Sequence, residues 1–323
     1  MNEPTKIPPD KVDALAERLQ TSLKRGRPRT WLVVVAATCV AIGLLALLAW
    51  WLYKPTQAPR LEVIALDAVA AVEKQSRVAA LLALPDRGEY PASVLRDHEC
   101  VFEIGGKQVK AQSDAKGRAA IDWGPIDKPA VEAIAVRYVD VRNKQGSADQ
   151  AKLFAWPAGS KVLVVDVVET LAQIEPERWA STHGADIPPR PDAARVLQQA
   201  ERNNWRVAYL AVTDGALDYR KVRGWIGAPR PAADRFPAGP VLGNRDFDVE
   251  NGADKVRQDR VKDLVDQFGG DVTLVTRSQD AASAGKSAGA RVIVLDPAIK
   301  MPGVRSVPGW SDVIPLLDRK RED

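Results

Sequence analysis

Cysteine and histidine are scarce in the sequence, with two of each among 323 residues. Cys39 lies inside an apolar run and Cys100 far along the chain, so we expect no disulfide between them, and cysteine usage does not indicate a compartment. His98 and His183 are isolated, and a lone histidine is usually a surface or hydrogen-bonded residue. The sequence therefore contains no zinc-type cluster of cysteine and histidine.

The sequence also has no large excess of positive or negative residues. The chain has 46 Lys and Arg against 42 Asp and Glu, a net charge of +4, and no basic patch is interleaved with aromatics. We therefore expect no nucleic-acid partner. What is present is typical of a folded protein, with 46% hydrophobic and 27% charged residues. The length allows two ordinary domains plus additional segments.

One long run has no charge at all: WLVVVAATCVAIGLLALLAWWLY, residues 31–53. It exceeds the roughly 20 residues that cross a bilayer as a helix. Trp31 at one end and Trp50, Trp51 and Tyr53 at the other suit the two membrane interfaces. The alternatives are a buried core helix, for which the run is long and lacks a polar face, and a signal peptide, for which no small-residue cleavage site follows. The run predicts a transmembrane helix.

The charges on each side of this run predict its orientation. Four basic residues precede it, Lys24, Arg25, Arg27 and Arg29, and only Lys54 and Arg60 follow closely. The positive-inside rule then places residues 1–30 in the cytoplasm and everything after residue 54 outside. We expect a single-pass protein of the inner (cytoplasmic) membrane, anchored in the lipid bilayer, with extracytoplasmic, for example periplasmic, domains.

Residues 54–60 read as a linker, and 61–157 as a small β domain. At least six short alternating runs are separated by turn signals, which favours a β-sandwich. The piece VKAQSDAKGRAAIDW resembles a hairpin of bacterial immunoglobulin-like domains, in which Asp114 and Gly117 tolerate the turn dihedrals. Any other small β domain remains the alternative. Nothing here looks catalytic, so a spacer or binding role is expected.

Residues 158–323 alternate between strand and helix patterns, which predicts an α/β domain with a parallel sheet covered on both faces. KVLVVDV is a buried strand that carries Asp166 to its carboxyl end. A second strand ends at Thr213, and TRSQD follows a later one. Open sheets of this kind bind ligands at the carboxyl ends of their strands.

The order of motifs in this segment resembles the haloacid dehalogenase (HAD) superfamily of phosphohydrolases. More narrowly it resembles the lipin-like phosphatidate phosphatase domain and its relatives in phosphatidylinositol-transfer proteins. The motifs that carry the resemblance lie within residues 160–300: DVVET (166–170) against D-x-D-x-T, YLAVT ending at Thr213, YRKVRGWI with Arg220 and Trp225, FPAGPVL (236–242), and VTRSQD (275–280) against G-N-R-x-x-D.

The resemblance implies a set of site residues. Asp166 stands at the position of the nucleophile, which also binds Mg²⁺, and Asp280 at a second metal-ligand position. The phosphate-binding residues would be Thr170, Thr213, Arg277 and, in place of the family's lysine, Lys255 or Arg257. Arg220 and Arg223 are further candidates for anion contacts.

Three positions depart from the family pattern. Val168 replaces the general acid/base, Thr276 replaces a metal ligand, and Val275 replaces the glycine before it. Glu169, next to Val168, could substitute as the acid/base only if the chain has already left the strand at that point. General acid/base catalysis alone contributes about 10²–10⁴-fold. We therefore expect a degenerate domain, a pseudoenzyme that binds a phosphate-bearing ligand, a phospholipid or a protein partner rather than turning it over efficiently. The alternatives are an active Mg²⁺-dependent phosphatase that uses Asp166, and a purely structural domain.

Overall fold

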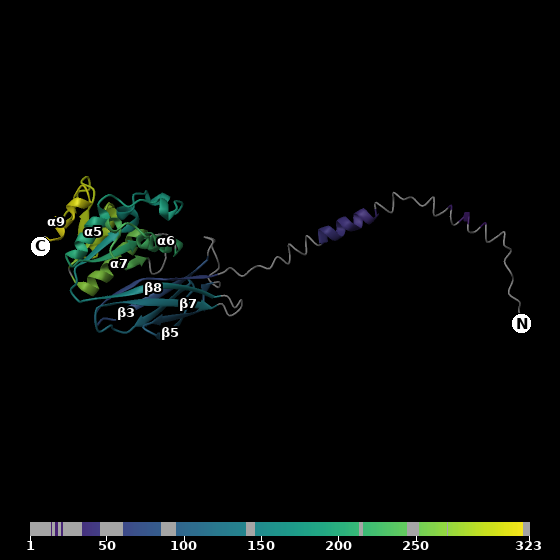
Figure 1. The fold of residues 1–323 in the computed structure, drawn as a ribbon, viewed down its shortest axis with the longest axis horizontal. Helices are drawn as coiled ribbons and strands as arrows, with labels where there is room; N and C mark the ends of the chain where they lie inside the picture. The colour runs from purple at the N-terminus through teal and green to yellow at the C-terminus, as the bar shows by residue number, and fades with distance from the viewer. Residues whose placement is uncertain are drawn as a thin grey trace. The chain divides into compact units, whose positions relative to one another are not determined.

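The structure is a computed structural model that describes residues 14, 17, 18, 21, 34–45, 61–84, 95–139, 146–212, 216–243, 252–269 and 271–318. The chain divides into two compact units, Met1–Pro59 and Arg60–Asp323 (Figure 1). The second unit contains three sheets, and it carries the candidate sites described below.

In the first unit, residues 34–45 form a helix whose side chains are exposed. No helix in the described part of the chain is long and apolar enough to cross a membrane. The predicted transmembrane helix over 31–53 is therefore wrong, and so is the single-pass inner-membrane location. The prediction rested on the apolar composition of residues 31–53, of which 31–33 and 46–53 lie outside the described residues.

Strands β1–β8 form two sheets, the β-sandwich (62–156). One sheet is antiparallel, with the order β1-β3-β6, from Glu62–Ala65, Ser76–Ala83 and Arg118–Trp123. The other has the order β2-β8-β7-β4-β5, from Ala68–Ala71, Gly146–Trp156, Ala130–Val139, Glu99–Ile104 and Lys107–Gln112. Alternation along β4 turns Cys100, Phe102 and Ile104 inward, where they join a core between the sheets. Burial raises the pKa of the Cys100 thiol to about 12, so this cysteine is not a reactive nucleophile.

The predicted hairpin at 109–123 differs in one respect. Its turn forms as expected, with Gly117 at φ 76° and the Asp114 carboxylate accepting from the N–H groups of Lys116 and Arg118. The strands on either side, however, do not pair with each other: β5 pairs with β4, and β6 pairs with β3. The turn thus carries the chain from one sheet to the other, because partner choice depends on long-range packing that a turn signal does not encode.

The α/β part (162–317) contains a parallel six-stranded sheet with the order β11-β10-β9-β12-β13-β14. Its strands are β9 Val162–Asp166, β10 Arg206–Ala211, β11 Val241–Gly243, β12 Val272–Thr276, β13 Arg291–Val294 and β14 Arg305–Ser306. The α-helices are α4 Pro176–Trp179, α5 Ala193–Arg202, α6 Ala216–Gly227, α7 Gly252–Phe268, α8 Gln279–Ser287 and α9 Ile314–Leu317. A π-helical turn, η1, covers Val167–Leu171, and 3₁₀ turns cover Gly184–Asp186, Ala232–Asp234 and Trp310–Asp312.

Strand alternation sorts the side chains of β9 between the two faces of this sheet. Leu163 and Val165 join the core with α5 and α6, whereas Val162 and Val164 join the core with α7 and α8. Asp166 is next in the alternation and faces α7. Strands β10 and β11 extend the sheet on one side of β9, and β12, β13 and β14 on the other. The strand order therefore reverses between β9 and β12, the point at which open α/β sheets bind ligands.

The β-sandwich and the α/β part share hydrophobic cores within the second unit. Ile64 and Leu81 of the sandwich belong to the same core as α5 and α6, and Phe154 and Trp156 belong to the core with α7. Polar contacts add to these: Arg223 of α6 pairs with Asp149 of β8 at 2.6 Å, and Arg220 with Glu62 at 2.5 Å. The β-sandwich thus packs directly against the α/β part, whereas a detached spacer domain would have a separate core.

Candidate functional site

Asp166, at the carboxyl end of β9, is held by an ion pair with Arg257 of α7. Arg257 Nε donates to Asp166 Oδ2 at 2.9 Å, and the two side chains are 8% and 2% exposed. Arg257 Nη1 also donates to Asp254 Oδ1 at 3.0 Å, one turn earlier on the helix. The carboxylate at the nucleophile position therefore already has a buried cation against its Oδ2, and a metal ion or phosphoryl group would have to compete with that cation for this oxygen.

Among the described residues, the positions around Asp166 do not bring a set of magnesium ligands together. Because Val275 pairs with Val165, Thr276 lies beside Asp166, and its hydroxyl accepts from the Ser278 N–H at 3.1 Å. Asp280 is exposed in the first turn of α8. In the described ranges, no three His, Cys, Asp or Glu side chains gather closely enough to hold a metal ion. Mg²⁺ prefers several oxygen ligands, and the described residues do not supply such a set at this position.

Two arginines lie near each other at this same edge. The Arg190 N–H donates to Leu171 O at 2.7 Å, which fixes Arg190 beside η1, and Arg277 directly follows β12. Burial and, to a smaller extent, the charge of Arg277 lower the pKa of Arg190. Arg190 Nε is buried without a hydrogen-bond partner. Within the described part of the chain, neither guanidinium has a carboxylate partner.

Thr170 adds a third polar group that has no partner. It lies in η1, a π-helical turn closed by a hydrogen bond from the Ala172 N–H to Val167 O at 2.9 Å. Single π-turns of this kind are frequent at functional sites. Trp310 Nε1 donates to Thr170 O at 3.3 Å, but the Thr170 hydroxyl is buried and makes no hydrogen bond. Two guanidinium groups and one hydroxyl at one strand edge form a set of donors suited to an oxyanion.

The other predicted site residues lie apart from this edge or outside the described residues. Lys255 is exposed on α7 and pairs with Asp259 of the same helix. Thr213 lies outside the described residues. Val168 is buried in the apolar core with α5 and α6. Arg190 was not predicted as a site residue, because the sequence around it, PPRPD, carries no ligand motif and its contact with η1 depends on the fold.

Several motif residues of the resemblance serve packing in this chain. In FPAGPVL, a Cβ on Gly239 would lie 2.0 Å from Val207 O, so only glycine fits against β10. Tyr209 donates its hydroxyl to Pro237 O at 2.7 Å. Trp225 is buried and donates from Nε1 to Ile187 O. Arg220, like Arg223, donates hydrogen bonds to the β-sandwich.

Comparison with known proteins gives no family assignment. No family model matches the chain, and no curated protein is significantly similar to it in sequence. Among solved structures, a HAD-superfamily hydrolase from Ehrlichia chaffeensis is 11% identical, covers 50% of this chain and 98% of its own, and has a TM-score of 0.32. A bacterial immunoglobulin-like domain from the M. primoryensis ice-binding adhesin is 15% identical, covers 30% and 92%, and has a TM-score of 0.19.

The fibronectin(III)-like modules of Clostridium thermocellum CbhA are another structural neighbour, at 16% identity and a TM-score of 0.22. They match 31% of this chain, and the chain spans about half of their length, 48%. A HAD-superfamily hydrolase and immunoglobulin-like or fibronectin-like domains are thus among the neighbours. With TM-scores this low, none of them is evidence for the activity of this chain.

Proposed function

We propose that the α/β part binds a phosphate-bearing ligand at the carboxyl edge of its sheet without a metal ion and without hydrolysing it. The observation that carries this proposal is the buried ion pair between Arg257 and Asp166, at 2.9 Å. It supplies the positive charge that a metal would bring to this position, and it engages the carboxylate that a phosphatase would use as its nucleophile.

The donors for the ligand are Arg190, Arg277 and the hydroxyl of Thr170. They lie beside the point where the strand order reverses, and none has a partner among the described residues. A buried donor without a partner costs about 1–3 kcal/mol, and a phosphoryl oxygen relieves that cost. Guanidinium groups suit this role because their planar N–H groups pair with two phosphoryl oxygens at once.

Two features oppose turnover. Val168 has no proton to give or take at the acid/base position, which removes a contribution of about 10²–10⁴-fold. Asp166 is in addition buried, and its Oδ2 accepts from Arg257, so an attack on phosphorus through this oxygen would first require the loss of a charge-assisted hydrogen bond. Both features leave the donors for the phosphate intact, which is why binding is the function that the geometry favours.

The test titrates phenyl phosphate into the full chain by calorimetry, with EDTA present. We expect Arg190→Gln and Arg277→Gln each to weaken binding by about 10-fold or more, since hydrogen bonds to charged groups contribute about 1.5–3 kcal/mol. Lys255→Gln is the matched control, because Lys255 is exposed and paired on α7. Equal affinity in the two arginine variants and the wild type would overturn the assignment of these donors.

A second set of measurements identifies which class of molecule carries the bound phosphate and tests for its hydrolysis. Glycerol 3-phosphate and a short-chain phosphatidate are compared at equal concentration, which separates a soluble phosphomonoester from a phospholipid headgroup. Hydrolysis of p-nitrophenyl phosphate is followed with and without Mg²⁺ in the wild type and in Asp166→Asn. Wild-type hydrolysis above that of Asp166→Asn would replace our proposal with the active phosphatase.

A further inference from the structure

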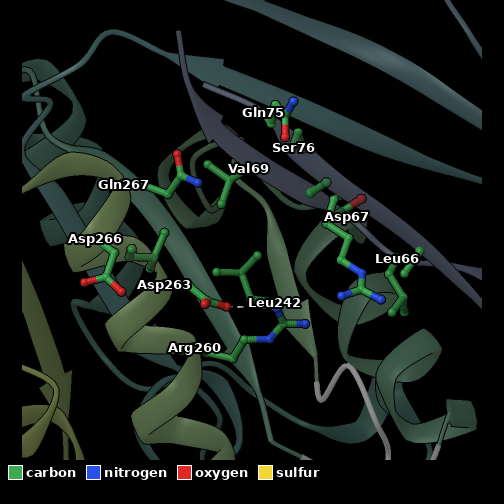
Figure 2. A pocket seen from close by; sticks show the side chains of 14 residues that line it. Leu66, Asp67, Val69, Gln75, Ser76, Leu242, Arg260, Asp263, Asp266 and Gln267 are labelled. Carbon is green, nitrogen blue, oxygen red and sulfur yellow. Dashed lines mark hydrogen bonds and ion pairs between the residues drawn. The ribbon is translucent and has the colours of Figure 1, made fainter. Parts of the chain in front are cut away.

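A second concave site lies where α7 faces the β-sandwich, and it is separate from the edge described above. It is a cavity of about 220 Å³, lined by the corner between β1 and β2, the beginning of β3, Leu242 of β11 and one face of α7. Figure 2 shows Gln267, Asp263 and Arg260 contributed by α7, and Gln75 and Ser76 by the sandwich. The cavity is thus formed only because the sandwich and the α/β part are packed together.

The charged groups around this cavity are mostly compensated within the protein. Arg260 Nε donates to Gly243 O at 2.7 Å, and its Nη1 lies 3.5 Å from Asp263 Oδ2. Asp266 pairs with Lys262 at 2.9 Å. The Asp67 carboxylate accepts from two backbone N–H groups, those of Lys152 and Val241, at 2.9 and 3.0 Å. Arg77 also lines the cavity, but it is exposed to solvent, which screens its charge, so the buried charges of the lining are the ones that matter and these are compensated.

The groups with spare hydrogen-bonding capacity are neutral. The Ser76 hydroxyl is buried in a residue that is 3% exposed, and it makes no hydrogen bond. Gln267 Oε1 accepts from the Ala71 N–H at 3.0 Å, which leaves the side-chain NH₂ group able to donate. The Gln75 amide lies beside Ser76 at the same wall. These groups offer both donors and acceptors, and Leu66, Val69 and Leu242 supply apolar surface between them.

We propose that this cavity binds a neutral, hydroxyl-rich molecule of about monosaccharide size. Each ligand hydroxyl can donate and accept, as the Ser76 hydroxyl and the glutamine amides require. The C–H face of such a ligand fits the apolar side chains. The volume lies below the roughly 300–1,000 Å³ of sites for drug-sized molecules, which selects a smaller ligand. The proposal does not depend on the phosphate site, because the two sites share none of the residues that bind.

The test uses saturation-transfer NMR on the full chain, with D-glucose, D-galactose, N-acetylglucosamine and myo-inositol as separate probes. We expect at least one probe to bind with a dissociation constant of about 1 mM, as a small ligand held by a few hydrogen bonds does. Ser76→Ala should weaken its binding by about 10-fold, the effect expected for losing a buried hydrogen-bond partner. Gln75→Ala, at an exposed position that tolerates change, should weaken it as well.

Ser283→Ala is the matched control, because Ser283 is an exposed serine on α8 away from the cavity, and it should leave binding unchanged. Failure of all four probes to bind the wild type would overturn the proposal and leave a cavity filled by water. Binding that is equal in the wild type, Ser76→Ala and Gln75→Ala would also overturn it. Arg277→Gln should leave the sugar signal unchanged, which separates this result from that of the phosphate site.

Discussion

Arg257 Nε and Asp166 Oδ2 lie 2.9 Å apart, and both side chains are almost fully buried. This ion pair connects the sheet to a helix of the second unit. Asp166 is the last residue of the central strand β9, and Arg257 lies in the first half of α7. Removing one partner of a buried ion pair is costly, because the other side chain then stays charged and buried without water or a counter-ion. The pair therefore determines both the stability of this edge and the chemistry open to Asp166.

Replacing Arg257 by Met should destabilise the protein by about 3–5 kcal/mol, because the Asp166 carboxylate is then buried without its cation. Asp166→Leu should cost a similar amount. In the double variant Asp166→Leu/Arg257→Met, most of this loss should return, since no charge is left uncompensated. Urea unfolding of the four proteins measures the coupling, and additive losses would show that the two residues do not act as a pair.

Gly239→Ala should destabilise the chain strongly, by about 3 kcal/mol or more, because the new methyl group would lie 2.0 Å from Val207 O and force β10 to move. Gly227→Ala is the matched control. No atom lies within 4 Å of a Cβ built there, and alanine is the better helix former at the end of α6. Thermal unfolding should show a large loss for the first variant and none for the second.

Arg223→Ala should cost about 2–3 kcal/mol, because Arg223 donates to Asp149 at 2.6 and 2.9 Å and to Ala65 O at 2.7 Å in a largely buried position. The loss falls on the contact between the β-sandwich and the α/β part. Arg195→Ala removes a comparable ion pair with Asp192 that is exposed, and it should cost less than about 0.5 kcal/mol. Similar midpoints of denaturant unfolding for the two variants would argue against a specific role for Arg223.

Asp67 should make the free energy of unfolding decrease as the pH rises through the acidic range. Burial raises the pKa of Asp67 above 3.8, and the N–H groups of Val241 and Lys152 offset only part of this rise. A group whose pKa is raised on folding stabilises the protein below its unfolded pKa, and this stabilisation is lost as the pH rises through the folded pKa. The free energy of unfolding of the wild type, minus that of Asp67→Asn, should therefore decrease as the pH is raised from about 4.

Asp114 is the internal control for this pH experiment, because its pKa moves in the opposite direction. Burial raises the pKa of Asp114, but hydrogen bonds from Arg118 and Lys116 outweigh it and lower the pKa overall. The stability that Asp114 contributes is present above its unfolded pKa and lost as the pH falls through the folded value. The difference between the wild type and Asp114→Asn should thus increase with pH over the acidic range. The same trend in both variants would contradict our view of the Asp67 environment.

The local parts of the fold were predictable from the sequence because they depend on neighbouring residues. The apolar run before Asp166 predicts a buried strand, and β9 is Val162–Asp166. Asp114 and Gly117 predict a turn, which forms. Which strands pair across that turn depends on packing over the whole sandwich, so the expected hairpin does not form. Likewise, apolar composition alone predicted a membrane-spanning helix over residues 31–53, and no helix among the described residues is long and apolar enough for that.

The candidate site was predictable only in part, for the same reason. The strand pattern places Asp166 at a sheet edge, but its partner Arg257 is 91 residues away in the chain. No local pattern indicates that α7 presents an arginine to this strand end. Arg190 reaches the edge through its backbone bond to Leu171, and its unpaired Nε becomes evident only when burial is known. The roles of Thr170, Arg277, Lys255 and Asp280 as ligands of phosphate or metal stay predictions.

The central claim, metal-free binding without turnover, is tested most directly by titrating phenyl phosphate into the full wild-type chain, once with EDTA and once with Mg²⁺. Calorimetry gives the dissociation constant, and NMR of the same samples shows whether phenol is released. We predict equal dissociation constants in the two titrations and no phenol. Binding that requires Mg²⁺, or release of phenol that stops in Asp166→Asn, would contradict the account.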